Sequence, residues 1–163
     1  MRLRLGGRSA NGLALVVALV VALVLAACGG TGPRPVVLGE DTCDFCRMEV
    51  SDARFAAEAI TRNGRVHVFD SVDCLAGYAR GAEPGSVVAL WVTDAEHPGT
   101  FVAVEQAGFL RGSTLRGPMG DAVAFASPTA ARAAQSLHGG AVADWATVFA
   151  DSSAHTAGAH GGR

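Results

Sequence analysis

Two segments of this chain repeat one pattern, and the repeat limits the fold more than any other feature of the sequence. Each segment has a short apolar strand, a Phe-x-Ser corner and a helical stretch that ends at glycine; they are Val66–Gly81 and Ala122–Gly139. Strands and helices that alternate in this way belong to mixed folds. We therefore predict an α+β fold, made of two tandem β-β-α-β units that pack as one small domain.

The expected strands come from residue periodicity and turn signals. Arg65–Phe69 alternates in polarity and follows Asn63-Gly64, a hairpin signal, so it should pair with a strand over Arg54–Thr61. Val87–Thr93 is a continuous apolar run that suits a buried central strand. Three further strands are predicted in the second half of the chain, over Phe101–Glu105, Ala122–Ala126 and Ala141–Trp145.

Both predicted helices begin at capping residues. Asp70 is expected to cap the first helix, with Asp73 in the capping-box position, and this helix should run to about Arg80. The pair Ser127-Pro128 should start the second helix, because proline is favoured at the first helical position. Glycines follow both helices and are expected to end them. A last turn of helix is predicted near residue 149.

The first 28 residues have the pattern of a lipoprotein signal. A stretch with three arginines precedes an apolar run, Leu13–Ala27, which is short for a membrane span and ends in Leu25-Ala26-Ala27-Cys28. Cleavage before Cys28 and acylation of its thiol would anchor the chain to a membrane by lipid. The alternative is an uncleaved anchor helix. Either interpretation places the domain outside the cytoplasm, in a periplasm or on the outer cell surface.

The signal divides the chain into four parts. They are a signal peptide over residues 1–27, a lipid-anchored linker over 28–39, a folded domain over 40–150, and a Ser-, Ala-, Gly- and His-rich tail over 151–163 that we predict to be disordered. Once the signal is removed, the remaining 136 residues suffice for one domain with a core. Ten arginines then face fifteen acids, a net charge of about −5, which argues against nucleic acid as a partner.

The cysteines indicate a metal site. Four are present, and acylation of Cys28 would leave an odd number of thiols, on Cys43, Cys46 and Cys74. Cys43 and Cys46 form a Cys-x-x-Cys pair, and Met48 lies on the same side of the chain if the segment is extended. Two thiolates and a thioether are soft ligands that favour Cu(I) over hard cations.

Alternatives to metal binding remain open. The Cys-x-x-Cys pair is also compatible with a structural disulfide or with a redox pair, although redox pairs usually open a helix after a buried strand. Cys74 falls in the first turn of the first predicted helix, where the helix dipole favours a thiolate, but a buried inert cysteine fits as well. Met119 lies in a proline- and glycine-rich loop that can present its thioether to an ion or cover the core. The sequence has no recognisable catalytic triad, phosphate loop or carboxylate pair, so we do not expect an enzyme.

Several short motifs occur in the order seen in one known family. Cys43-x-x-Cys46-x-Met48, Phe69-Asp70-Ser71-Val72-Asp73, Pro118-Met119-Gly120 and His138-Gly139-Gly140 follow the lipobox cysteine. Over residues 40–149 the chain resembles the nitrous-oxide reductase accessory lipoproteins, the NosL family. The resemblance implies a copper chaperone built from a pair of β-β-α-β units. By position it implies Cys43, Cys46, Met48 and Met119 as ligands, whereas Cys74 rests on its local environment alone.

The sequence therefore predicts a lipid-anchored, extracytoplasmic Cu(I)-binding protein that passes its ion to a client apoenzyme. The candidate ligands are Cys43, Cys46, Met48, Met119 and Cys74, and Cys28 is the expected lipidation site. The resemblance implies nitrous-oxide reductase, or another copper enzyme, as the client. The competing hypotheses are a disulfide-stapled binding module and a thiol-disulfide oxidoreductase.

Overall fold

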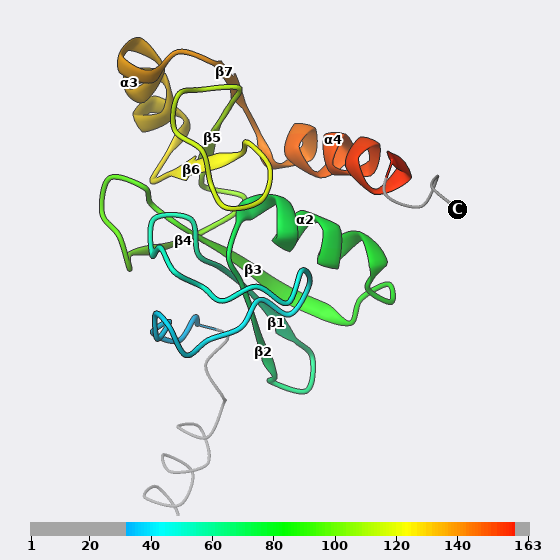
Figure 1. Cartoon of the computed structure of the whole chain (residues 1–163). Coiled ribbons are helices and arrows are strands. Elements are labelled where there is room, and N and C mark those ends of the chain that lie inside the picture. The colour runs from blue at the N-terminus through cyan, green and yellow to red at the C-terminus, as the bar shows by residue number, and fades with distance from the viewer. Residues whose placement is uncertain (1–31, 159–163) are drawn as a thin grey trace, which may run out of the picture. The chain divides into compact units, whose positions relative to one another are not determined.

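Two antiparallel sheets organise the part of the chain that the computed structural model describes, residues 32–158 (Figure 1). The strand order is β2-β1-β3-β4 in the first sheet and β6-β5-β7 in the second. The predicted class, a small mixed domain of helices and strands, is confirmed. The proposed signal peptide and Cys28 lie outside the described residues, as do residues 159–163.

The first sheet contains four strands and carries one helix. The strands are β1 (Ala57–Thr61), β2 (Val66–Phe69), β3 (Val87–Thr93) and β4 (Phe101–Ala103), and helix α2 (Val72–Gly81) packs against β1, β2 and β3. β1 and β2 form the hairpin predicted at Asn63-Gly64, where Gly64 has a φ of +80°. β3 has the predicted bounds and lies in the interior of the sheet, between β1 and β4.

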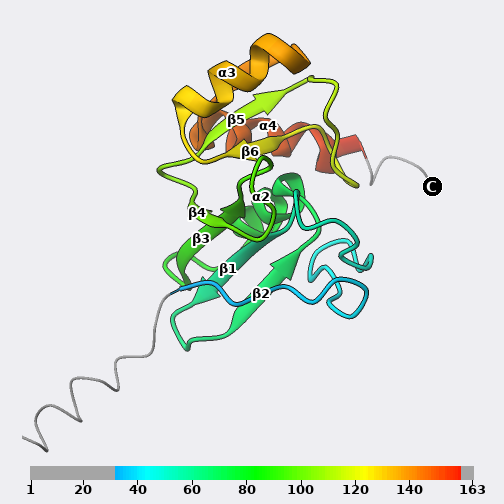
Figure 2. The same ribbon diagram turned by 90° about the vertical axis from the view of Figure 1, so that its left-hand side faces the viewer.

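The second sheet is smaller and is covered by a helix. Its strands are β5 (Gly108–Arg111), β6 (Val123–Phe125) and β7 (Ala141–Ala143), and helix α3 (Pro128–His138) packs on all three. The last helix, α4 (Trp145–Gly158), packs against α2. Figures 1 and 2 show that α3 lies on the far side of this sheet from α2.

Ser127 caps α3 as predicted, but the predicted cap of α2 is wrong by one residue. Ser71, rather than Asp70, has the extended backbone of an N-cap, and its Oγ accepts the N–H of Cys74 at 3.1 Å. A serine and an aspartate cap helices about equally well, so propensity alone does not choose between adjacent candidates. Asp70 therefore does not cap the helix. It lies inside the domain and is 1% exposed.

Several predicted strand and helix bounds differ from the structure, among them the ends of β6 (Val123–Phe125) and β7 (Ala141–Ala143), and one strand was not predicted. Residues 53–55 form a turn, so the strand expected from residue 54 begins at Ala57, and β4 stops at Ala103. β5 was not predicted, because its four residues show no alternation long enough to mark a strand. α4 continues to Gly158, past residue 150, where the disordered tail was expected to begin.

The segment expected to be a linker is attached to the first sheet before residue 40. The Arg34 N–H donates to Glu58 Oε2 at 3.0 Å, and the Arg34 guanidinium forms an ion pair with Asp41 at 2.6 Å. Val36 packs on a small buried cluster made of Val50, Ala56 and Val68. The chain therefore contacts the domain from Arg34 onward.

One hydrophobic core joins the two sheets. It contains Phe69 and Leu75 from the first sheet and α2, Phe109 from β5, and Val148 from α4, all at most 1% exposed. A second cluster fills the space between the second sheet and α3, through Leu110, Val123, Phe125, Ala131 and Ala134. Two cysteines, Cys43 and Cys74, belong to the main core.

Candidate metal centre

The cysteine loop, residues 42–49, is a tight hairpin. Thr42 and Glu49 form an isolated antiparallel bridge, and the Cys43 N–H donates to the Met48 carbonyl at 2.8 Å. Arg47 reverses the chain with a φ of +66°, a left-handed conformation that costs a residue with a side chain about 1 kcal/mol. The turn brings the two cysteines of the Cys-x-x-Cys pair to one side of the loop.

Two contacts hold the cysteine loop against the domain. The Asp44 N–H donates to the Val68 carbonyl at 2.8 Å, which fastens the loop to β2. The ring of Phe45 lies on Gly77 of α2, where an added Cβ would come 2.6 Å from the ring. The glycine inside this helix therefore makes room for a side chain that stands between the two cysteines.

The loop and the start of α2 together form a cluster of four potential metal ligands. The ligand atoms of Cys43, Cys46, Asp70 and Cys74 all lie within 4.8 Å of one another. Cys43 and Cys74 are buried and Cys46 is partly exposed, so the cluster has one accessible side. The Cys46 thiol donates to Asp70 Oδ2 at 3.4 Å, and all three thiols are free.

Hydrogen bonds make Cys43 more acidic than an ordinary thiol, and burial and hydrogen bonds make Cys46 and Cys74 less acidic. The Cys74 thiol donates to Cys43, and with the N–H groups of Cys46, Asp70 and Phe45 this lowers the pKa of Cys43 to about 6, against the effect of burial. Burial raises the pKa of Cys46 to about 11. The pKa of Cys74 is also raised, because its proton is held by Cys43. At neutral pH the cluster therefore presents one thiolate, and a metal ion would displace protons from the other two thiols.

The donor set fits a soft cation. Three sulfurs suit Cu(I), and a fourth donor from a carboxylate is also compatible with a tetrahedral zinc site. Asp70 Oδ1 is buried without a hydrogen-bond partner, which is costly unless a cation faces it. The cluster therefore has donor atoms that suit a metal ion, and a buried carboxylate oxygen that a bound cation would stabilise.

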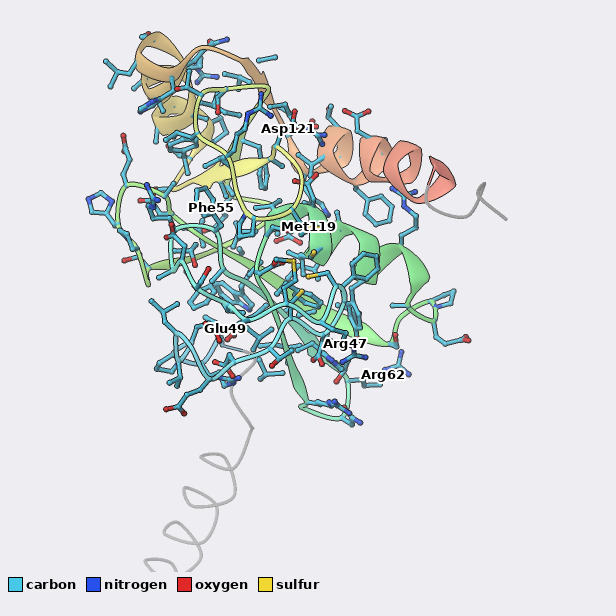
Figure 3. The ribbon with its side chains drawn as sticks, viewed as in Figure 1. Arg47, Glu49, Phe55, Arg62, Met119 and Asp121 are labelled. Carbon is cyan, nitrogen blue, oxygen red and sulfur yellow. The ribbon has the colours of Figure 1, made fainter. Side chains whose placement is uncertain are left out.

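The two predicted methionine ligands lie at the surface. Met48 is 48% exposed and Met119 is 40% exposed. The loop that carries Met119 rests on the first turn of α2, because the Ala122 N–H donates to Asp73 Oδ2 at 2.9 Å. In the view of Figure 3, Met119 is drawn close to a group of sulfur atoms. Whether either thioether binds metal stays a prediction.

Asp70 is the member of the cluster that sequence reasoning missed as a ligand. Its predicted role was helix capping, although the corner Phe69-Asp70-Ser71 belongs to the motifs that carry the family resemblance. The remaining signal was the serine at the next position, which can cap the helix as well as the aspartate can. Cys74 was a candidate on local grounds, and the structure brings it next to Cys43 and Cys46.

Comparison with known proteins identifies the family. A sequence model of the family described as NosL matches residues 36–153. The chain belongs to the NosL family. The matched range begins within the attached segment and ends in α4, so it contains both sheets and the cysteine cluster.

A solved NosL structure shares the fold. The crystal structure of the copper chaperone NosL from Shewanella denitrificans has a TM-score of 0.57 and 19% sequence identity, and the match covers 72% of this chain and 95% of that one. The solution structure of apo-NosL from Achromobacter cycloclastes is 27% identical, with a TM-score of 0.42 and coverage of 55% and 82%. No curated protein matches the chain.

Proposed function

We propose that this NosL-family protein binds Cu(I) at the cysteine cluster and delivers the ion to a client apoenzyme. The observation that carries the proposal is the convergence of three thiols and one carboxylate within 4.8 Å. Soft sulfur donors in this number favour Cu(I) over magnesium or calcium. The family's link to nitrous-oxide reductase makes that enzyme the first candidate client, and another copper enzyme the second.

Binding and release would proceed by ligand exchange. The Cys43 thiolate is the first donor available, and each further thiol that binds copper loses its proton to solvent or to a nearby base. Asp70 accepts the hydrogen bond of Cys46 and so orients that thiol within the cluster. Cys46 is the accessible thiol, so a client ligand would enter on its side. Such an exchange makes no bond in an organic substrate, and the function is accordingly not enzymatic.

Exposed thioethers would assist capture of the ion. Met48 and Met119 lie at the surface on segments that adjoin the cluster, the cysteine loop and the loop bound to Asp73. Replacing Met119 by leucine should weaken Cu(I) binding and leave the fold intact, because leucine keeps the apolar volume without the sulfur. If the variant and the wild type bind Cu(I) with equal affinity, Met119 is not a ligand.

An anaerobic Cu(I) titration tests the function. Residues 29–163 would compete with a chromophoric Cu(I) chelator, beside a Cys43→Ser/Cys46→Ser variant. We expect tight binding of about one ion per chain in the wild type and its loss in the variant. If the wild type does not compete with the chelator, the copper hypothesis is wrong and the cluster is structural.

Thiol counting and insulin reduction address the two alternatives. Native protein with three reactive thiols after denaturation would oppose the disulfide-stapled module, which leaves only Cys74 free. A thiol-disulfide oxidoreductase would reduce insulin and lose that activity in Cys46→Ser. We expect three thiols and no insulin reduction.

A lipid anchor would hold the protein at an extracytoplasmic membrane surface. The support is the signal pattern that ends at Cys28. Within residues 32–158, no helix is both long and apolar enough to cross a bilayer. Metabolic labelling with a fatty acid should mark the wild type and not Cys28→Ala, and an unlabelled wild type would contradict the anchor.

We also propose that the two sheets are copies of one β-β-α-β unit. Strand, strand, helix and strand follow one another in both β1–β3 and β5–β7, and the first strand lies between the other two in each sheet. Both helices begin after a Phe-x-Ser corner whose serine is the N-cap. Superposition of the two halves should align these elements in sequence order; helices on opposite faces would refute the repeat.

A further inference from the structure

A groove lies beside the cysteine loop, at the open edge between the first sheet and α2. It has a volume of about 660 Å³, within the range of about 300–1,000 Å³ that is usual for ligand pockets. The β1–β2 hairpin supplies one wall, α2 and the residues after it supply the other, and the cysteine loop closes one end. The residues that matter for recognition are Phe45, Arg62, Arg65, His67, Tyr78 and Glu83.

The groove is positively charged in a domain that is otherwise acidic. Residues 32–158 hold nine arginines and fifteen acids, a net charge of −6 with histidine neutral. Most of the other arginines have acidic partners. By contrast, neither Arg62 nor Arg65 forms an ion pair within the described residues; the Arg62 guanidinium donates to the Gly85 carbonyl instead.

The acidic side chains near the groove offset this charge only in part. Asp44 is occupied by the His67 ring, with 2.7 Å between Asp44 Oδ2 and His67 Nδ1. Glu83 is the carboxylate that lines the groove. Arg47 adds a further cation: its side chain is 74% exposed, and its ion-pair distance to Asp44 is 3.5 Å. Figure 3 shows Arg47 and Arg62 on the same side of the domain, below the sulfur atoms in that view.

The walls of the groove match a peptide segment better than a single small anion. The His67 and Tyr78 rings stack with 4.8 Å between their centroids, and Phe45 is 42% exposed. These rings form an apolar surface between the arginines and the cysteine loop. A ligand that matches both features carries carboxylates together with at least one apolar side chain.

The position of Phe45 connects the groove to the metal centre. Phe45 lines the groove and stands between Cys43 and Cys46 in the sequence, and Cys46 is the accessible thiol of the cluster. A segment bound in the groove would therefore lie beside the loop that carries Cys46. This placement is the one that ligand exchange with a client requires.

We propose that this groove binds a short acidic segment of the client protein and so positions the client's copper ligands at Cys46. The inference rests on the proposed function, because it names the chemistry of the partner in copper transfer. The segment carries Asp or Glu side chains that pair with Arg62 and Arg65, and an apolar side chain that packs on Tyr78 and Phe45.

A labelled peptide tests the groove directly. The probe is a fluorescent peptide, acetyl-Asp-Glu-Phe-Asp-Glu-amide, and its control replaces every acid by lysine; both are titrated with the full-length protein in non-ionic detergent. We expect the acidic peptide to bind, the lysine peptide not to bind, and added salt to weaken binding. Absence of binding by the acidic peptide, or equal binding of both peptides, overturns the proposal.

Matched charge-reversal variants locate the binding. Arg62→Glu/Arg65→Glu should lower affinity for the peptide by at least about tenfold. The control, Arg116→Glu/Arg132→Glu, makes the same change in charge at exposed arginines outside the groove and should bind as the wild type does. Equal losses in both pairs would show that only net charge matters, and would overturn the proposal.

Two further measurements separate this proposal from its alternatives. Cu(I) affinity should be unchanged in both variant pairs. If the wild type binds the peptide but no Cu(I), the proposed function is wrong and the groove is still a peptide-binding site. Vesicles of phosphatidylcholine and phosphatidylglycerol test a lipid surface. If the groove arginines are needed for vesicles and the acidic peptide does not bind, the groove faces lipid and the proposal is wrong.

Discussion

Asp70 illustrates how the environment of a single residue sets the character of the candidate metal centre. Its carboxylate is 1% exposed, one oxygen accepts the Cys46 thiol, and the other has no hydrogen-bond partner. A buried carboxylate oxygen without a partner is unfavourable in the metal-free protein. A bound cation would remove that penalty, so Asp70 should contribute to affinity through its charge even if the sulfurs make the bonds.

The prediction is that Asp70→Asn lowers Cu(I) affinity by about tenfold, which corresponds to 1.4 kcal/mol. The amide keeps the size of the side chain and removes its negative charge, so folding should be retained. Competition with a Cu(I) chelator measures the effect. Asp94→Asn is the matched control, because Asp94 is equally buried and lies outside the cluster. An Asp70→Asn variant with wild-type affinity would mean that the carboxylate takes no part in binding.

Glu58 should make the stability of the protein depend on pH. Burial raises the pKa of Glu58 above its ordinary value of 4.5, and only one of its oxygens has a partner. The folded state therefore holds this proton more tightly than the unfolded chain, and stability falls as the pH rises through the titration of Glu58. The pKa of Asp41, lowered by Arg34, affects stability only at more acidic pH.

The measurement is the free energy of unfolding of the wild type and of Glu58→Gln between about pH 5 and pH 8. Glutamine does not titrate, so the stability of the variant relative to the wild type should increase with pH and then level off. Contributions from other groups, such as Asp41, are present in both proteins and cancel. A difference that stays constant or decreases with pH would contradict the assignment.

That the site residues lie close together could be predicted from sequence only where they are neighbours in sequence. Cys43 and Cys46 lie three positions apart, so any turn brings their sulfurs together. The proximity of Cys74 depends on the hydrogen bond from Asp44 to Val68, which docks the cysteine loop on β2. No local pattern encodes that contact, and the role of Asp70 depends on it as well.

At the scale of elements, the fit between the cysteine loop and α2 depends on one glycine. Gly77 costs the helix about 1 kcal/mol relative to alanine, yet a Cβ there would come 2.6 Å from the Phe45 ring. Gly77→Ala should therefore displace the ring. We expect Cu(I) affinity to fall severalfold and the free energy of unfolding to change by no more than about 1 kcal/mol, because the gain in helix propensity offsets the lost contact.

Two controls make the Gly77 prediction specific. Gly81→Ala is the matched substitution in the same helix, where nothing lies within 4 Å of an added Cβ, and it should leave Cu(I) affinity unchanged. In Phe45→Ala the ring is absent, so adding Gly77→Ala should cause no further loss of affinity. Additive losses in the double variant would place the effect elsewhere in α2.

The elements that could be predicted are those whose ends are marked by signals in the local sequence. The bounds of β3 follow from an uninterrupted apolar run, and the start of α3 follows from Ser127-Pro128. β5 was missed because it is short and its burial comes from both sides: Phe109 faces the main core and Leu110 faces the cluster under α3. A strand buried on both faces loses the alternation by which sequence reasoning recognises strands.

At the scale of the whole molecule, the two sheets share their core and an ion network. Arg111 on β5 lies 2.7 Å from Asp121 and 3.7 Å from Asp73 of α2, and its side chain is 15% exposed. Phe109 packs in one cluster with Phe69 and Leu75. Because these contacts cross from one sheet to the other, neither half has a complete core of its own.

The domain should therefore unfold in a single cooperative transition. The two tryptophans report on different places in the fold: Trp91 lies on β3 of the first sheet, and Trp145 begins α4 and contacts Phe109 of the second sheet. Single-tryptophan variants, Trp91→Phe and Trp145→Phe, should give fluorescence transitions with denaturant that coincide with those from circular dichroism of the same variants.

Phe109→Ala should lower the free energy of unfolding by about 3–5 kcal/mol and shift both transitions together. Its ring contacts Trp145 at 6.1 Å between centroids, so a shift confined to the Trp145 signal would show that the second sheet unfolds by itself and that the shared core does not couple the halves.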